Sequence, residues 1–177
     1  MIRHERHYDL DLAGQTLYAL GNTVLPISVQ NSVSGVSNGS DQTEDVVMTY
    51  SLPANTFGAA GVQGLIIEAW GTFASTGDTK TVKGYFGSTA FTHSAAATNG
   101  GTWWVELWVM RTSASVFSVL GSGQFGTSLS TLSGTTGNAQ TETAAITIKI
   151  TGQNTSNNAV AVTCNNMTIW TIEQAHA

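Results

Sequence analysis

The sequence predicts an all-β protein, an antiparallel sandwich or barrel of about eight to ten strands, from three observations. Several segments alternate apolar and polar residues with a period of two, the spacing of a strand with one buried face. Clusters of Gly, Asn, Ser and Thr separate these segments, and the chain has 19 glycines but only 2 prolines. No segment keeps an apolar period of 3.6 residues, and Lys and Glu, the usual surface helix formers, are scarce.

The first predicted strands lie in the N-terminal third of the chain. Residues 23–29 and 46–52 are short runs that combine β-branched and apolar residues. Residues 31–43 between them are rich in Ser, Gly and Asn, which favour turns, so we expect a long surface loop there.

The clearest alternation covers residues 65–73. One face would carry Leu65, Ile67, Ala69 and Phe73, and the other would carry Ile66, Glu68, Trp70 and Thr72. A polar turn and a second strand at residues 80–86 predict an antiparallel hairpin. The register that gathers the apolar residues on one face, with Val82 and Phe86 among them, sets Trp70 opposite Lys83 and Glu68 opposite Tyr85.

A second strong alternation covers residues 103–111. One face would carry Trp103, Val105, Leu107 and Val109, and the other Trp104, Glu106, Trp108 and Met110. Residues 116–132 predict one or two short strands broken by glycines, and the glycine-rich segment 121–137 is otherwise expected to be a surface loop.

The C-terminal part predicts three more strands. Ile146, Ile148 and Ile150 alternate with Thr147, Lys149 and Thr151, which indicates a strand with one solvent-facing side. Val160, Val162 and Cys164 continue the pattern. Asn165 and Asn166 predict a turn into residues 167–173, so we expect a C-terminal hairpin.

Length and charge limit the classes of function. A chain of 177 residues fits one domain, placed at 21–177, with an N-terminal arm at 1–20. The net charge of −5 argues against binding to a nucleic-acid backbone, which needs a basic surface. No stretch approaches the roughly 18 apolar residues of a membrane span, and the charged first residues do not resemble a secretory signal.

The predicted arm differs from the rest of the chain because it holds many charges in few residues. These are Arg3, Glu5, Arg6, Asp9 and Asp11, with His4 and His7 among them. Such a segment does not stabilise a fold of its own. Two interpretations stay open: a solubilising tail, or an arm that docks on a neighbouring subunit.

Four patterns could carry chemistry, and none predicts a catalytic, cofactor or metal site. Residues 121–126 match GxGxxG, but no helix is predicted after them, as a dinucleotide site requires. Glu68 and Glu106 could form a glycosidase pair, or could be isolated acids facing Lys83, a rim or a subunit neighbour. The histidines, His93 and His176 included, lack metal-ligand spacing. The single cysteine, Cys164, has no neighbouring base and is expected to be buried.

The aromatic residues are the more informative set. If the strands above turn their aliphatic faces to the core, a second face remains that carries Trp70, Tyr85, Trp104, Trp108 and Met110. Three interpretations stay open for this face: a subunit interface, a stacking platform for sugars, or a second core surface under loops.

Two segments resemble a pattern of structural proteins of tailed bacteriophages. The first reads Glu-Ala-Trp-Gly-Thr-Phe-Ala at 68–74, and the second Thr-Lys-Thr-Val-Lys-Gly-Tyr-Phe-Gly at 79–87. The strand that begins Gly-Gly-Thr-Trp-Trp at 100–104 and ends at Arg111-Thr112 fits the same layout, so the resemblance covers about residues 65–112.

This resemblance implies a jelly-roll-like β-sandwich, often trimeric, and a non-enzymatic role in the virion. The short chain, the absence of fibre-type repeats and the charged arm favour a capsid decoration (cement) protein at the capsid surface, present in the host cytoplasm during assembly. Its expected partners are the major capsid protein and its own copies, with no nucleic acid or membrane. The alternative is a tail or head-fibre module that binds a host glycan. The candidate interface residues are Arg3, Arg6, His7, Trp70, Tyr85, Trp104, Trp108 and Met110.

Overall fold

A computed structural model describes residues 25–37, 39–57, 62–95, 100–126 and 128–173, which form ten strands. The strands are β1 (Leu25–Ser37), β2 (Asp45–Leu52), β3 (Val62–Phe73), β4 (Lys80–Phe86), β5 (Thr89–Ala95), β6 (Thr102–Ser113), β7 (Val116–Phe125), β8 (Ser128–Ala139), β9 (Ile146–Asn154) and β10 (Val162–Glu173). These residues include no helix long and apolar enough to cross a membrane. The all-β prediction is confirmed, whereas the predicted arm at 1–20 lies outside the described residues.

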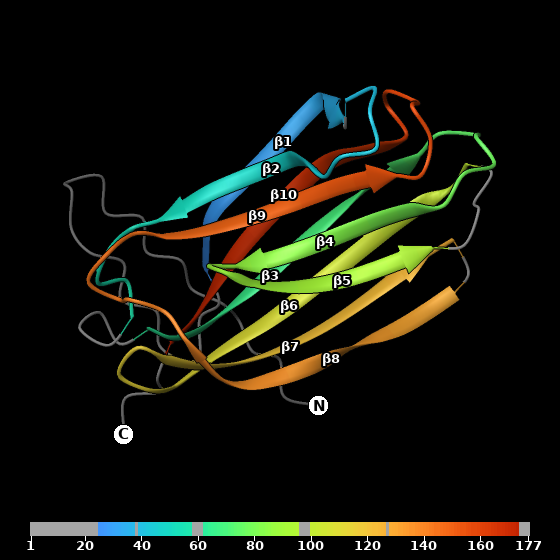
Figure 1. Cartoon of the computed structure of the whole chain (residues 1–177). Coiled ribbons are helices and arrows are strands. Elements are labelled where there is room, and N and C mark those ends of the chain that lie inside the picture. Colours follow the sequence, from blue (N-terminus) through green and yellow to red (C-terminus); the bar gives the residue numbers. More distant parts are fainter. Residues whose placement is uncertain (1–24, 38, 58–61, 96–99, 127, 174–177) are drawn as a thin grey trace, which may run out of the picture.

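The strands form two antiparallel sheets that face each other as a sandwich (Figure 1). One sheet has the order β1-β10-β3-β6-β7-β8, and the other has the order β2-β9-β4-β5. Without β7 and β8, these orders are those of a jelly roll, in which eight strands form two Greek keys. The hairpin of β7 and β8 therefore widens one sheet of a jelly roll.

The core lies between the sheets and is built by the predicted alternation. The predicted inward residues of β3, β4, β6 and β9 are buried: Leu65, Ile67, Ala69, Phe73, Val82, Phe86, Trp103, Val105, Leu107, Val109, Ile146, Ile148 and Ile150. Thr151, predicted to face solvent, is also buried. At Gly71 an added Cβ would lie 1.8 Å from the carbonyl oxygen of Thr163 and 2.6 Å from the Trp103 ring, so only glycine fits there.

The predicted hairpin between residues 65–73 and 80–86 is wrong. β3 is hydrogen-bonded to β10 on one side and to β6 on the other, so it has no free edge for β4. β4 pairs instead with β5 and β9 in the other sheet. The faces were predictable because burial is the same in either sheet, whereas the partner strand depends on segments far along the chain.

A buried lysine holds the connection that crosses between the sheets. The Lys80 side chain is fully buried, and its ammonium donates hydrogen bonds to the carbonyl oxygen of Thr76 at 2.5 Å and to Asp78 Oδ1 at 3.2 Å. The amide of Asn154 donates to the other oxygen of Asp78 at 3.0 Å. A buried ammonium needs such partners, so this cluster ties the crossing segment to the end of β9.

Three predicted irregular segments are strand. The predicted loop at 31–43 begins as the second half of β1, and the glycine-rich segment 121–137 lies in the hairpin of β7 and β8. The predicted C-terminal hairpin is one strand, β10, which has a bulge between Cys164 and Asn166 where a turn was expected. Glycine and serine were misleading here because neighbouring strands supply the hydrogen bonds and the packing.

Candidate binding face of the six-stranded sheet

The outer face of the six-stranded sheet gathers the polar and aromatic halves of β3 and β6. Their antiparallel register sets Ile66 opposite Trp108, Glu68 opposite Glu106, and Trp70 opposite Trp104. Side chains directly opposite on neighbouring strands have Cβ atoms about 4.5–5.5 Å apart. The two glutamates therefore lie side by side, flanked by Trp104 and Trp108 along β6 and by Ile66 and Trp70 along β3. We call the outer side chains of β10, β3, β6 and β7 the aromatic face.

The aromatic face exposes large apolar side chains to solvent. Trp70 is 47% exposed, Trp108 42%, Met110 38% and Leu120 58%. Leu120 is the cross-strand partner of Trp108 on β7, so these side chains adjoin each other. Contiguous exposed apolar surface of this kind marks an interaction site.

The two carboxylates are held by tryptophan side chains of the same face. The indole N–H of Trp170, on β10, donates a hydrogen bond to Glu68 Oε2 at 3.0 Å. The indole N–H of Trp108 donates to Glu106 Oε1. Ile66, Glu68, Glu106 and Trp170 line a shallow open pocket, which we call the carboxylate pocket. Each carboxylate thus keeps one oxygen that has no hydrogen bond within the described residues.

The charge of this pocket is not balanced by the described part of the chain. The ion pairs among the described residues lie elsewhere and join Lys80 to Asp78, Lys83 to Glu44 and Arg111 to Glu142. The ammonium of Lys149 lies 4.3 Å from the centroid of the Tyr85 ring, on the other sheet. Like charges directly opposite on neighbouring strands destabilise a sheet, so the Glu68–Glu106 pair has a cost in the free protein.

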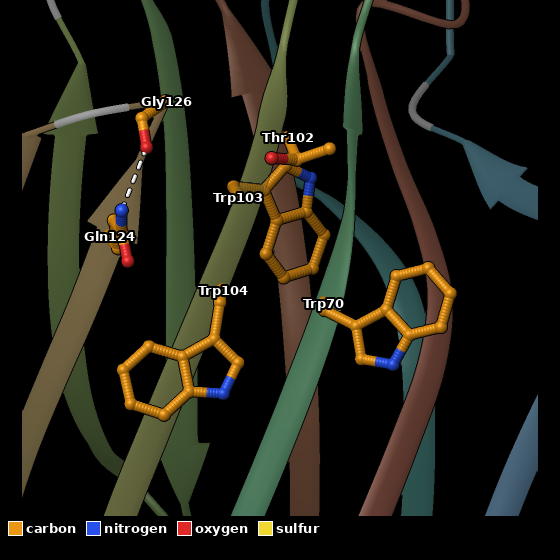
Figure 2. A pocket seen from close by; sticks show the side chains of 6 residues that line it. All are labelled: Trp70, Thr102, Trp103, Trp104, Gln124 and Gly126. Atoms are coloured by element: carbon orange, nitrogen blue, oxygen red, sulfur yellow. Dashed lines mark hydrogen bonds between the residues drawn. The ribbon is translucent and has the colours of Figure 1, made fainter.

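A second shallow pocket lies at the other end of the aromatic face. It is lined by Trp70, Trp104, Thr102, Gln124 and Gly126, with part of Trp103. Figure 2 shows the indoles of Trp70 and Trp104 beside each other on neighbouring strands. The Gln124 amide donates a hydrogen bond to the carbonyl oxygen of Gly126 at 2.9 Å, which fixes its orientation. Two indoles bordered by hydroxyl and amide groups can stack on a ring and hydrogen-bond to its edge.

Tyr85 does not belong to the aromatic face, contrary to the prediction. It lies on β4 in the other sheet, where its hydroxyl donates a hydrogen bond to Glu44 Oε1 at 2.5 Å. Burial, together with the hydrogen bond and charge of Glu44, raises the pKa of Tyr85 to about 12. Lys83 forms an ion pair with the same carboxylate. Trp70, Trp104, Trp108 and Met110 are brought together as predicted, whereas Arg3, Arg6 and His7 lie outside the described residues.

The other chemical candidates fall in structural positions. Cys164 is buried against the Trp70 and Asn166 carbonyls, and burial raises the pKa of its thiol to about 12. The GxGxxG segment forms the second half of β7 and is followed by another strand, β8. No group of three or more His, Cys, Asp or Glu side chains that could hold a metal occurs among the described residues.

The contribution of β10 to this site was not predicted from the sequence. Trp170 lies 102 positions from Glu68 in the chain, and the predicted turn at Asn165–Asn166 obscured its face. A strand running through the bulge gives Thr168, Trp170 and Ile172 a common outward direction, which was the available signal. Leu120 and Gln124 were missed because residues 116–132 were expected to hold only short strands broken by glycines, and no faces were assigned to them.

Comparisons with known proteins give little further information. No protein-family model matches the chain, and no curated protein does. A solved structure of a protein of unknown function from Shewanella oneidensis MR-1 is similar with a TM-score of 0.42 and 11% identity, over 96% of this chain and 87% of that one. The fold assignment therefore rests on the strand order described above.

Proposed function

We propose that this protein is a non-enzymatic capsid decoration protein that binds the assembled lattice of a bacteriophage through its aromatic face. The observation that carries the proposal is the exposure of Trp70, Trp108, Met110 and Leu120 on one side of the sandwich, with Trp108 and Leu120 directly opposite each other on neighbouring strands. The sequence resemblance of residues 65–112 to virion proteins supplies the class of partner.

The mechanism is linkage between binding and assembly. A protein that binds the assembled lattice, but not its separate subunits, stabilises the lattice by the free energy of that binding. Tryptophan and methionine are enriched at such interfaces: tryptophan buries a large apolar area with only two side-chain torsions, and methionine adapts its shape to the partner. Side chains on paired strands are already positioned before binding, so little binding free energy is lost to ordering.

The location of the chain on the virion is the direct test. We expect density for a jelly roll on the capsid surface in cryo-electron microscopy, with the aromatic face toward the lattice. Trp70→Ala with Trp108→Ala should reduce capsid occupancy, because both side chains contribute exposed apolar area. Val46→Ala is the matched control, since Val46 is 50% exposed and lies on the other sheet. Density on the tail, or full occupancy of the double variant, would contradict the proposal.

The same face also supports self-association, most simply as a trimer. Light scattering of the purified protein should then give a multiple of the protomer mass, and the Trp70/Trp108 double variant should give a smaller species. A monomer with both tryptophans fully quenchable by acrylamide would exclude this part of the proposal.

A second function, binding of a host glycan, is favoured by the Trp70–Trp104 pocket. Its two indoles and its Thr102 and Gln124 groups match the stacking and edge contacts of a sugar site. A glycan array separates the two functions: retained glycan that is lost in Trp104→Ala, with no hydrolysis, would assign a receptor module. Hydrolysis abolished by Glu68→Gln or Glu106→Gln in a folded protein would instead assign a glycosidase.

A further inference from the structure

We propose that residues 1–7 of the chain dock on the aromatic face and place an arginine, Arg3 or Arg6, between Glu68 and Glu106 in the carboxylate pocket. The occupant would be the protein's own N-terminal segment, so the free protein would cover part of the surface that it presents to a partner. This assignment goes beyond the proposed function and does not depend on a capsid.

The first argument is the chemistry of the pocket. Glu68 and Glu106 each have one oxygen bound by an indole N–H and one left over. The indole hydrogen bonds hold the two carboxylates in fixed orientations beside each other. A guanidinium group has five N–H donors in a rigid plane, so it can bridge two such oxygens, and its faces stack on aromatic rings. Trp108 and Trp170 supply those rings at the pocket itself.

The second argument is the distribution of cations along the chain. The sequence has 6 Lys and Arg residues. Three form the ion pairs of Lys80, Lys83 and Arg111, and Lys149 lies over Tyr85 on the opposite sheet. Arg3 and Arg6 are the remaining two cations of the chain, and Glu68 and Glu106 are adjacent acids without an ion pair among the described residues.

The third argument is reach. β1 is next to β10 at the sheet edge, and Pro26 is the cross-strand partner of Trp170. With strands about 4.8 Å apart, β3 and β6 lie about 10 and 14 Å from β1. A flexible coil with as many residues as lie between Arg6 and Pro26 would have an end-to-end distance of about 25 Å, which exceeds the distance to the pocket. Such a tether gives an effective concentration in the millimolar range, which makes docking within one chain favourable.

The indole N–H groups of Trp108 and Trp170 report directly on the pocket, because they bind its carboxylates. The experiment compares their indole ¹H–¹⁵N signals in the full chain and in the full-length double variant Arg3→Gln/Arg6→Gln. We expect both signals to shift, and the signal of Trp103 to stay unchanged because that side chain is buried in the core. Lys149→Gln is the matched control, since it removes a cation from the opposite sheet.

Three outcomes decide the proposal. In a chain that also carries Glu68→Gln and Glu106→Gln, the arginine substitutions should leave the Trp108 and Trp170 signals unchanged. In the natural chain, molar salt should shift these signals as the arginine substitutions do, because it screens the ion pairs. Unchanged Trp108 and Trp170 signals in Arg3→Gln/Arg6→Gln would overturn the docking and leave the pocket to a cationic group of another molecule. A shift that disappears on dilution would overturn the intrachain assignment and place the arm on a second copy.

Discussion

The outer faces of the two sheets differ in how their charged side chains are neutralised. On the four-stranded sheet, Glu44 binds both Lys83 and the Tyr85 hydroxyl, and Lys149 lies over the Tyr85 ring. On the six-stranded sheet, Glu68 and Glu106 stand beside each other among exposed indoles and have no cationic partner within the described residues. On the first face Glu44 is paired with a lysine, whereas on the second face two adjacent glutamates have no ion pair among the described residues and large apolar side chains are exposed. This difference is the reason why we propose the face of the six-stranded sheet, and not that of the four-stranded sheet, as the binding surface.

The Asp78–Lys80 ion pair is the most deeply buried one among the described residues. Of the changes considered, breaking it should lower the free energy of unfolding most. Asp78→Ala should lower the free energy of unfolding by about 3–5 kcal/mol, because it leaves the fully buried Lys80 ammonium without its carboxylate. Urea denaturation followed by circular dichroism measures the loss. Asp41→Ala, in an exposed turn, is the control and should cost much less. A similar loss in both variants would show that Lys80 is not held by Asp78.

Acid should destabilise the protein through its internally paired carboxylates. Burial would raise the pKa of Asp78, but hydrogen bonds from Thr76, Asn154 and Ser156 hold it well below the usual range. Glu44 is likewise lowered, despite burial, by Lys83 and Tyr85. Because the folded-state values are depressed, this stability is present above the unfolded values of about 4 and is lost as the pH falls below them. Thermal midpoints measured from pH 7 downward should decline in that acid range, and a midpoint that stays constant would contradict the pairing.

A single charge removed from the four-stranded sheet should have a moderate cost. Glu44→Gln keeps an acceptor for Tyr85 but removes the charge that pairs with Lys83, so we expect a loss of about 1 kcal/mol. High salt should reduce the difference between the variant and the natural protein, since this pair is partly exposed. A stabilised Glu44→Gln variant would remove the contrast between the two faces.

The equivalent change on the aromatic face should have the smallest effect and the opposite sign. In the chain with Arg3→Gln and Arg6→Gln, Glu106→Gln should raise the free energy of unfolding by about 0.5 kcal/mol, because it relieves the repulsion from Glu68. Glutamine still accepts the hydrogen bond from Trp108. With both arginines present the gain should be smaller, and a loss in both backgrounds would show that the two carboxylates do not repel.

Local patterns were sufficient to predict which side chains are buried. The alternation in β3 and β6 placed Leu65 and Val105 inward, and Trp70 and Trp108 outward, and the structure confirms these faces. Burial follows from a period of two within one strand, so a short window of sequence contains the information.

Strand partners could not be predicted in the same way. Glu68 was assigned to Tyr85, its nearest candidate along the chain, but its cross-strand neighbours are Glu106 and Thr168. These pairings join distant segments, and every register that keeps the apolar side inward satisfies the local pattern. The carboxylate pocket is a product of such long-range pairing, which is why its residues were visible singly but not as a site.

The hairpin of β7 and β8 is an addition to the eight strands of the jelly roll. The eight other strands complete both Greek keys without it, so its length is not constrained by the topology. Its base is joined to the core by Phe117, whose ring lies 4.7 Å from that of Phe57 and 5.0 Å from that of Phe86, and its other end is joined by Phe125, whose ring lies 5.1 Å from that of Phe73. Because Phe117 and Phe125 anchor both ends, we expect a peptide inserted after Gly126 to leave the packing of the hairpin intact, so the sandwich would serve as a scaffold that displays foreign sequences at the edge of its wider sheet.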